Sequence, residues 1–370
     1  MNPKIFFLNT FSKWGGGEKW TFETAVELHR RGYDVVIGTT PESELGQRAQ
    51  EAGLKIKTVS LKSNLSAFNP FKIFSFRNYL RREKINILFL NLTQDMKFGA
   101  LAGKLAKVDK IIFRRGSAIP IKDRIYTKFY LRDCLTGIIA NSEATKGTIL
   151  VNTSDWLDEA KIKVIYNGIK LDEIKAEIGK PGTNIREEFG IKPEKILIAN
   201  VGRLSRQKGH QYLVETVKCM VDKGIKGFKV IIVGGGGLES EIKAQVKELG
   251  LEDYIILTGF RTDIYNIMKQ MDFLLHTALW EGFGFVIAEA MAIGKPVVST
   301  DVSNISEIIV DGETGYLAQS ENPEDIADKV IRMMNTDNRE KMGEKGQRIV
   351  EEKFSFAKAT DQLENLFIKS

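Results

Sequence analysis

The sequence predicts an α/β fold made of two parallel sheets, each covered by helices on both faces. Short apolar runs alternate with amphipathic stretches along the 370 residues, and the alternation occurs as two separate series. The composition, with 43% hydrophobic and 28% charged residues, 33 Gly and 8 Pro, is that of a folded soluble protein. This balance excludes a disordered, a collagenous and a disulfide-stapled chain.

The strand candidates of the first series are short apolar runs, with helical patterns such as 19–31 and 71–82 between them. They are Lys4–Asn9, Asp34–Thr39, Ile56–Ser60, Ile85–Asn91, Lys110–Phe113 and Gly137–Asn141. The second series alternates with helical stretches near 208–223, 238–249, 283–293 and 323–335. Its strand candidates are Ile196–Val201, Lys229–Val233, Ile255–Thr258, Phe273–His276, Pro296–Ser299 and Gly315–Leu317.

A polar stretch with a Pro-Gly turn, 168–190, separates the two series and lacks a strong apolar period. We therefore expect a first Rossmann-like domain over 1–170 and a second over 171–352. The last stretch, 353–370, is amphipathic, and we expect a helix there that packs back on the first domain.

Cysteine content and hydropathy point to a cytoplasmic protein. Cys134 and Cys219 lie in apolar stretches and are expected to be reduced packing residues. No apolar run approaches the roughly 18 residues that a membrane span needs. The apolar start of the chain is followed by Gly-rich sequence rather than a cleavage site, so it is expected to be a strand and not a signal peptide.

The net charge of +6 is unevenly distributed, with +11 on residues 1–180 and −5 on the remainder. Such an asymmetry fits an anionic partner of the first half, such as phospholipid, nucleic acid or an anionic substrate. An uneven solvated surface explains it equally well.

The segment Asn200–Gly209 (NVGRLSRQKG) carries the strongest chemical signal. A predicted strand ends at Gly202, two cations follow at Arg203 and Lys208, and a helix begins near Lys208. Ligands of parallel α/β sheets bind beyond the carboxyl ends of strands, and a helix start favours an anion. The two cations are therefore expected to bind an anion, most plausibly a diphosphate. The alternative is a solvated basic loop.

The segment Glu281–Glu289 (EGFGFVIAE) also follows a predicted strand and opens a helix. Its two glycines allow close backbone approach and present N–H donors. Glu281 and Glu289 are eight residues apart, about two helical turns, and fall on roughly one face. Such carboxylates accept hydrogen bonds from the vicinal hydroxyls of a sugar and a ribose. Glu289 alone would also fit an exposed helical position.

Two further glycine-rich loops are weaker signals. Trp14–Lys19 (WGGGEK) opens a helix after the first strand, as an anion cradle or as a plain flexible turn, and lacks the full G-x-G-x-x-G spacing. Gly234–Gly237 also follows a strand, as a tight turn or as part of the same binding site.

Taken together, these motifs resemble the GT4 family of retaining glycosyltransferases, which have the GT-B fold of two Rossmann-like domains facing a cleft. The first half matches loosely, through Gly15–Glu18 and Asn141-Ser142. The matching pieces of the second half are Val164–Ile169, Gly202–Gly209, Val233–Gly237, Thr258–Arg261, Glu281–Pro296 and Asp311–Gly315.

The resemblance implies a role for each matching residue. Arg203 and Lys208 correspond to the pair that neutralises the leaving nucleoside diphosphate, and Glu281 to the residue that binds the donor sugar; these three are the catalytic candidates. Glu289 corresponds to the acceptor of the ribose hydroxyls. The remaining donor-binding candidates are backbone positions, namely Gly16, Gly17, Gly202, Phe260, Arg261, Gly282, Phe283 and Gly284.

The resemblance also implies retention of configuration by front-side attack, with no cofactor and no essential metal. The chain has no Asp-x-Asp pair to bridge a metal and phosphates. With three His and two Cys, a Cys/His metal site is not expected. Positive charge is then expected from side chains and helix ends.

The acceptor side departs from the family, many members of which carry a His after a strand of the first domain. Here those regions read Asn91–Asp95 and Arg114–Ala118, and the histidines are His29, His210 and His276. We expect His29 to be a surface residue and His276 to touch the donor site or lie in its surroundings. Arg114 and Arg115 suggest an acceptor with a phosphate or carboxylate, or form a solvated pair.

Residues 68–84 (FNPFKIFSFRNYLRREK) combine aromatic and basic side chains. This segment would suit an anionic membrane surface. The alternative, which the pattern favours, is an amphipathic helix that packs on the sheet before the strand Ile85–Asn91.

The function expected from these features is transfer of a sugar from a nucleotide sugar, preferably a UDP-sugar. The acceptor would be a glycan or lipid-linked glycan of cell-envelope polysaccharide or lipopolysaccharide biosynthesis, bound by a cytoplasmic or membrane-peripheral enzyme. The alternatives are another enzyme on the same fold, such as a nucleotide-sugar epimerase or a phosphorylase, and a catalytically silent sugar-binding protein. Nucleic acid is not an expected partner, since the basic residues are not interleaved with aromatics in a recognised module.

Overall fold

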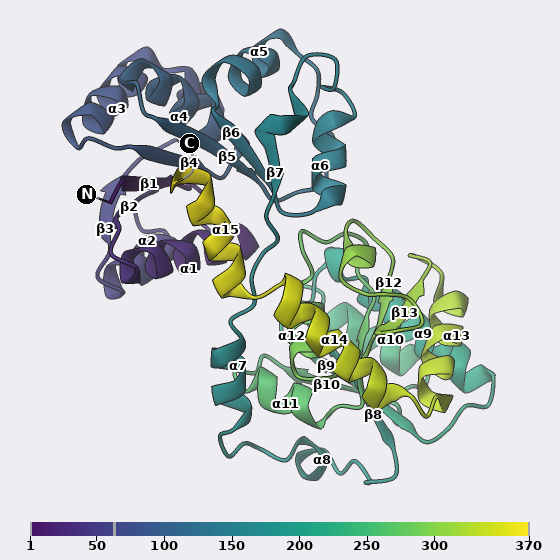
Figure 1. The fold of residues 1–370 in the computed structure, drawn as a ribbon. Helices are drawn as coiled ribbons and strands as arrows, with labels where there is room; N and C mark the ends of the chain where they lie inside the picture. Colours follow the sequence, from purple (N-terminus) through teal and green to yellow (C-terminus); the bar gives the residue numbers. More distant parts are fainter. Residues whose placement is uncertain (1, 62–63, 369–370) are drawn as a thin grey trace. The chain divides into compact units, whose positions relative to one another are not determined.

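A computed structural model describes residues 2–61 and 64–368 of the chain (Figure 1). The chain forms two compact units. The first comprises Met1–Asn167 together with Ala359–Ser370, and the second comprises Gly168–Lys358. Each unit is a parallel sheet between helices, so the predicted pair of doubly wound α/β domains is confirmed.

In the described part of the first unit, seven strands pair in the order β3-β2-β1-β4-β5-β6-β7, all parallel. The short β7 was not predicted, because three residues carry too little periodicity to be recognised. The strands are β1 (Lys4–Leu8), β2 (Asp34–Thr39), β3 (Lys55–Thr58), β4 (Ile87–Leu90), β5 (Lys110–Arg115), β6 (Gly137–Ala140) and β7 (Ile162–Val164).

Alternate residues of these strands face opposite sides of the sheet, so each side has its own apolar core. Phe6 and Leu8 belong to one core, and Ile5 and Phe7 to the other. Helices α3 and α4 cover the first side, and α1, α2 and α15 the second (Figure 1). The helices are α1 (Gly16–Arg30), α2 (Glu44–Glu51), α3 (Pro70–Arg82), α4 (Thr93–Ala106), α5 (Ile125–Lys128), α6 (Glu143–Leu150) and α15 (Phe356–Ile368).

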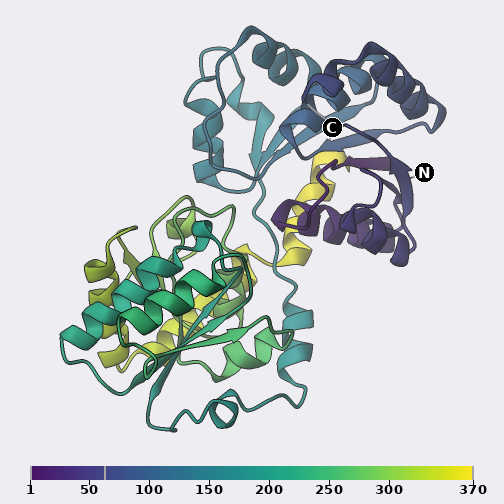
Figure 2. The same ribbon diagram turned by 180° about the vertical axis from the view of Figure 1, so that it is seen from behind.

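Helix α15 brings the end of the chain back to the first unit, beside α1 (Figures 1 and 2). Leu363 is buried in the core of that unit. The Phe367 ring meets the rings of Tyr33 and Phe89 edge to face, at centroid distances of 5.8 and 6.3 Å. Arg31 also pairs with Asp361 across 2.7 Å.

In the second unit, six described strands pair in the order β10-β9-β8-β11-β12-β13, again all parallel. Side chains such as Phe228, Phe273 and Leu213 fill its core. The strands are β8 (Ile196–Val201), β9 (Phe228–Val233), β10 (Ile255–Gly259), β11 (Phe273–His276), β12 (Val297–Thr300) and β13 (Gly315–Ala318).

The stretch 168–190, expected to separate the two domains, contains two helices, α7 and α8. Both are short and mostly exposed, and each buries one Ile, which explains why the apolar period is weak. The helices of this unit are α7 (Leu171–Ile178), α8 (Ile185–Glu188), α9 (His210–Asp222), α10 (Glu239–Glu248), α11 (Ile264–Gln270), α12 (Phe285–Ala292), α13 (Pro323–Asn335) and α14 (Arg339–Lys353).

Candidate active site

The strand order of the second unit changes direction at β8, because β9 lies on one side of it and β11 on the other. Phe273 of β11 is paired with Ile198 of β8, so the two strands end at the same edge of the sheet. Ligands of open α/β sheets bind at such a switch point, beyond the carboxyl ends of the strands. The two strongest sequence motifs are the segments that follow β8 and β11.

These two segments are joined by backbone hydrogen bonds. The Leu279 N–H donates to the carbonyl of Gln207 (2.8 Å), and Thr277 Oγ1 donates to the carbonyl of Lys208 (3.1 Å). Gly209 makes this approach possible. A Cβ at that position would lie 2.1 Å from the Thr277 carbonyl oxygen, and the backbone φ is +61°.

Lys208 and Glu281 meet at this edge as an ion pair, with Nζ donating to Oε1. Lys208 belongs to a 3₁₀ turn over Arg206–Lys208, and the methylenes of its side chain lie over Gly202. The side chains of Lys208 and Glu281 are 19% and 9% exposed. The structure therefore brings together two of the three predicted catalytic residues.

His276, the last residue of β11, is the third member of this cluster. Its Nε2 lies 3.2 Å from Glu281 Oε1 and its Nδ1 lies 3.0 Å from Ser299 Oγ. A carboxylate accepts only, so Nε2 donates to Glu281. Nδ1 faces the Ser299 hydroxyl, which itself donates to the Thr300 carbonyl (3.0 Å). His276 is 2% exposed, so it contacts the Glu281 carboxylate from within the core of the unit.

The charge state of the cluster follows from these contacts. Burial by itself raises the pKa of Glu281, but the hydrogen bond from His276 and the charge of Lys208 outweigh it and lower that pKa to about 2. Burial lowers the pKa of His276, and the Lys208 charge acts in the same direction. At neutral pH the cluster therefore consists of a carboxylate, an ammonium and a neutral imidazole.

The residues after Glu281 shape the start of α12. Gly284 precedes the helix with φ of +90°, and the Phe283 side chain is 2% exposed. Asn304 Nδ2 donates to the Phe283 carbonyl (3.1 Å). The Gly282 N–H donates to Glu281 Oε2 (3.2 Å), so this predicted donor to the sugar contacts its own neighbour here.

The third predicted catalytic residue, Arg203, and the predicted donor-binding residues Phe260, Arg261 and Glu289 lie outside the hydrogen-bonded cluster. Arg203 is exposed in the loop after β8, and Phe260, after β10, is 79% exposed. Glu289 is half-buried in α12 and accepts from the Tyr265 hydroxyl (3.3 Å). Arg261 pairs with Asp263 at 2.8 Å and also with Glu188, so its guanidinium anchors the loop to α8.

The predicted residues of the first unit follow β1 and end β5. Gly16 and Gly17 form the first turn of α1, and a Cβ on Gly17 would meet open space. Arg114 is buried, with its guanidinium 4.3 Å from the centre of the Trp20 ring and 2.8 Å from Asn167 Oδ1. Arg115 faces the other side of the sheet and lines a pocket.

Sequence reasoning missed His210, a buried neighbour of the cluster at the start of α9. Burial, followed by the nearby charge of Lys208, lowers its pKa to about 4. Its place directly after the motif Gly202–Gly209 was the available signal. Both of its ring nitrogens are buried without a hydrogen-bond partner among the described residues.

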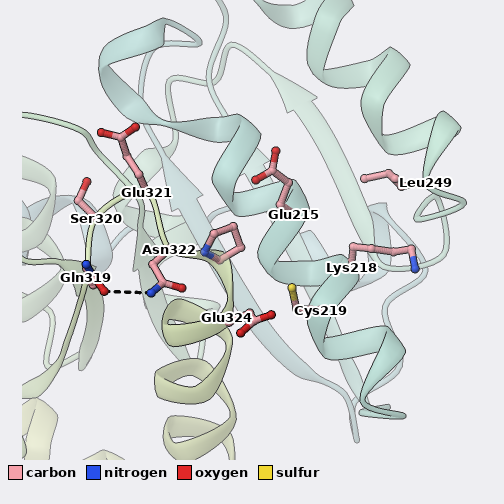
Figure 3. A pocket seen from close by; sticks show the side chains of 10 residues that line it. Glu215, Lys218, Cys219, Leu249, Gln319, Ser320, Glu321, Asn322 and Glu324 are labelled. Atoms are coloured by element: carbon pink, nitrogen blue, oxygen red, sulfur yellow. Dashed lines mark hydrogen bonds between the residues drawn. The ribbon is translucent and has the colours of Figure 1, made fainter.

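A separate hollow of about 580 Å³ lies between α9 and the segment that leads into α13 (Figure 3). Its carboxylates come from Glu215, Glu321 and Glu324. No residue of the Lys208 cluster lines it. Among the described residues, no group of three or more His, Cys, Asp or Glu side chains is arranged to hold a metal ion.

In the described ranges, no helix combines the length and the apolar character that crossing a bilayer requires. The two described cysteines, Cys134 and Cys219, are free.

Known proteins resemble the chain along its whole length. Residues 14–173 match the model of Glycosyltransferase Family 4, and residues 182–349 match that of Glycosyl transferases group 1. The capsular polysaccharide biosynthesis glycosyltransferase CapM of Staphylococcus aureus is 27% identical, over 99% of this chain and 97% of its own. A UDP-Gal:alpha-D-GlcNAc-diphosphoundecaprenol alpha-1,3-galactosyltransferase of Escherichia coli is 25% identical over 84% of this chain and 82% of its own.

Solved structures share the fold. A glycosyltransferase from Rickettsia africae superposes with a TM-score of 0.87 at 21% identity, covering 100% of this chain and 98% of its own. HepE of Anabaena, solved in complex with UDP, superposes with a TM-score of 0.83 at 21% identity, covering 99% of this chain and 100% of its own. With the two family matches, these likenesses identify the chain as a member of the GT4-type glycosyltransferases, built on the GT-B fold.

Proposed function

We propose that this glycosyltransferase transfers a sugar from a UDP-sugar, with retention of configuration, to a glycan or lipid-linked glycan. The single observation that carries the proposal is the Lys208–Glu281–His276 cluster at the switch point of the second sheet. An ionised carboxylate there can accept hydrogen bonds from sugar hydroxyls, and the adjacent ammonium can attract a diphosphate.

In the proposed reaction, the acceptor hydroxyl oxygen bonds to the anomeric carbon on the face from which the nucleoside diphosphate leaves. The bond from that carbon to the diphosphate oxygen breaks, and the hydroxyl proton passes to the departing diphosphate. Lys208 and Arg203 would stabilise the charge that develops on the diphosphate, without an essential metal or cofactor. Glu281 would hold the sugar and Glu289 the ribose.

The choice of donor and acceptor follows the relatives. The Anabaena structures contain UDP and UDP-glucose, and the Escherichia coli relative is named for UDP-galactose and a diphosphoundecaprenol acceptor. The Staphylococcus relative is named for capsular polysaccharide and a Rhizobium relative for lipopolysaccharide core. We infer a place in the same broad class of cell-envelope glycan assembly, on the cytoplasmic side where nucleotide sugars are available.

A thermal-shift panel of UDP-, GDP- and ADP-sugars tests the donor, because a ligand that binds only the folded state raises the unfolding temperature with concentration. The preferred donor is then incubated with acceptor glycans with and without EDTA, and the anomeric configuration of the product is read by NMR. The expected product keeps the donor's configuration and forms equally well with EDTA. An inverted product, or release of a free epimer without acceptor, would overturn the proposal.

We also propose that the first unit binds anionic membranes through α3. Its buried face carries Ile73, Phe76 and Leu80, so the helix does pack on the sheet. The opposite face presents Phe71 and Phe74, which are 85% and 54% exposed, and the exposed Arg81 and Arg82 follow on that face. Exposed aromatics beside arginines suit an anionic lipid surface.

Co-sedimentation with vesicles tests this second proposal. Phosphatidylglycerol vesicles are expected to bind the protein and phosphatidylcholine vesicles to leave it in solution, with binding falling as salt rises. The double variant Phe71→Ser/Phe74→Ser should lose most of the binding. Equal binding of the double variant and the wild-type chain would exclude α3 as the contact.

A further inference from the structure

A small pocket opens at the carboxyl ends of β4 and β5 in the first unit. Its volume is about 220 Å³, and its polar lining comes from Thr93, Lys97, Arg115, Lys122, Tyr126 and Thr127. Arg115 is the last residue of β5, and Thr93 is the first residue of α4, shortly after β4. The pocket therefore lies at the edge of the sheet where α/β proteins bind ligands.

Cations line this pocket without a carboxylate among the lining residues. They are Lys97, Arg115 and Lys122. In the described part of the chain none of these three pairs with an acid. The neighbouring Asp123 pairs with Lys128 instead, at 3.6 Å.

The partners that these cations do have leave their charge uncompensated. Arg115 donates one hydrogen bond to the Ile119 carbonyl (2.6 Å), while its buried Nε has no hydrogen-bond partner. Lys97 Nζ lies 5.1 and 5.7 Å from the centres of the Tyr126 and Phe68 rings. A half-buried guanidinium without a counter-ion is unfavourable, and burial accordingly lowers the pKa of Arg115. An anionic ligand would supply the missing charge.

Size and lining indicate what kind of anion fits. Pockets that enclose whole ligands measure about 300–1,000 Å³, so this one suits a single group of a larger molecule. The threonine hydroxyls and the three cations offer several donors in different directions, which matches the tetrahedral oxygens of phosphate better than a planar carboxylate. Met96, Phe113 and Leu131 form an apolar wall.

We propose that this pocket binds a phosphate of the acceptor, so that the acceptor is a glycan carried on a phosphate or diphosphate. The inference rests on the proposed function, because it names the class of acceptor for that same transfer. It assigns the acceptor contact to Arg115 and not to the buried Arg114. It also adds Lys97 and Lys122, which sequence reasoning did not single out.

Direct binding tests the pocket without relying on turnover. Two synthetic probes are compared by isothermal titration, an alkyl N-acetylglucosaminide and the same sugar joined to the same alkyl chain through a diphosphate. The wild-type chain should bind the diphosphate probe more tightly. Lys97→Gln and Arg115→Gln should each weaken that binding about 10- to 100-fold and leave the binding of the phosphate-free probe unchanged.

Lys110→Gln is the matched control, since it removes one positive charge from the opposite end of the same strand, β5. Arg115 is half-buried, so circular dichroism melting accompanies its variant, and Lys97→Gln keeps the test valid if Arg115→Gln does not fold. Equal losses for both probes, or an equal loss in Lys110→Gln, would overturn the inference.

The failure of the inference and the failure of the proposed function give different results. If sugar is transferred to both probes with the same KM, the proposed glycosyl transfer is supported and the proposed phosphate pocket is refuted. If the diphosphate probe binds as expected but no donor sugar is transferred to any acceptor, the proposed function is refuted. The pocket would then be an anion-binding site without a role in transfer.

Discussion

The Lys208 ammonium forms an ion pair with the Glu281 carboxylate. Lys208 can therefore hold Glu281 in place and, in the proposed reaction, also attract the leaving diphosphate. We predict that Lys208→Ala lowers the rate constant of transfer about 100- to 1,000-fold, as expected when a donor to developing negative charge is removed. Initial rates under donor saturation measure this effect. Arg206→Ala removes an exposed cation from the same turn and should retain wild-type turnover. A Lys208→Ala variant that folds and turns over like the wild type would contradict the role.

The low pKa of Glu281 leads to a prediction about how the stability of the protein depends on pH. Burial opposes ionisation, but His276 and Lys208 bring the folded pKa to about 2, below the ordinary value of 4.5. Ionised Glu281 therefore stabilises the folded state fully above about pH 4.5, and this contribution to the free energy of unfolding is lost as the pH falls toward 2. The urea concentration at the midpoint of unfolding should be lower at pH 3 than at pH 6, and this difference should be smaller in Glu281→Gln than in the wild type. Glu340→Gln, an exposed control, should keep the wild-type difference.

Single residues also mark how far the sequence alone could define the site. Arg203, Lys208 and Glu281 could be placed at strand ends because apolar runs define those ends. The bond between His276 and Glu281 needed the rotamers of two packed loops, which no spacing encodes. Arg114 and Arg115 look alike in sequence, yet alternation along β5 sends one into the core against Trp20 and the other into a pocket.

At the scale of elements, the strands were largely predictable and several helices were not. Helix α4 carries Gly99 and Gly103, which obscure its pattern, yet a Cβ on Gly99 would lie 2.3 Å from the Leu90 side chain. These glycines allow α4 to pack closely on β4. This is a requirement of the tertiary structure, which helix propensity along the sequence cannot reveal. Helix α14 was missed because its sequence is dominated by charged and polar residues, with four buried positions.

The contact between the segments after β8 and β11 gives a prediction at this scale. Gly209→Ala would place a methyl group against the Thr277 carbonyl, at a backbone φ of +61°. The two segments must then separate, so both UDP affinity and stability should fall. Gly224→Ala is the matched control, because its φ of +74° is similar while its Cβ meets open space.

In the control variant Gly224→Ala, the free energy of unfolding should fall by about 1–2 kcal/mol, because alanine is disfavoured in the left-handed backbone conformation. Its affinity for UDP should be unchanged. Gly209→Ala should lose more stability than that, and affinity as well. Urea unfolding and titration calorimetry with UDP measure the two effects. Equal stabilities and equal affinities in the two variants would show that the close approach of the segments is not needed for binding.

For the whole molecule, the chain enters the second unit at Gly168 and leaves it at Lys358, so the first unit is closed by a helix from the other end of the sequence. Leu363 of that helix is 2% exposed in the core of the first unit. We predict that Leu363→Ala lowers the stability of the first unit by about 2–5 kcal/mol, since it leaves a cavity. Differential scanning calorimetry with and without UDP separates the units, because a ligand stabilises the unit that binds it. The variant should move the UDP-insensitive transition to lower temperature and leave the UDP-sensitive one in place. A shift of the UDP-sensitive transition by the same amount would mean that the two units unfold as one.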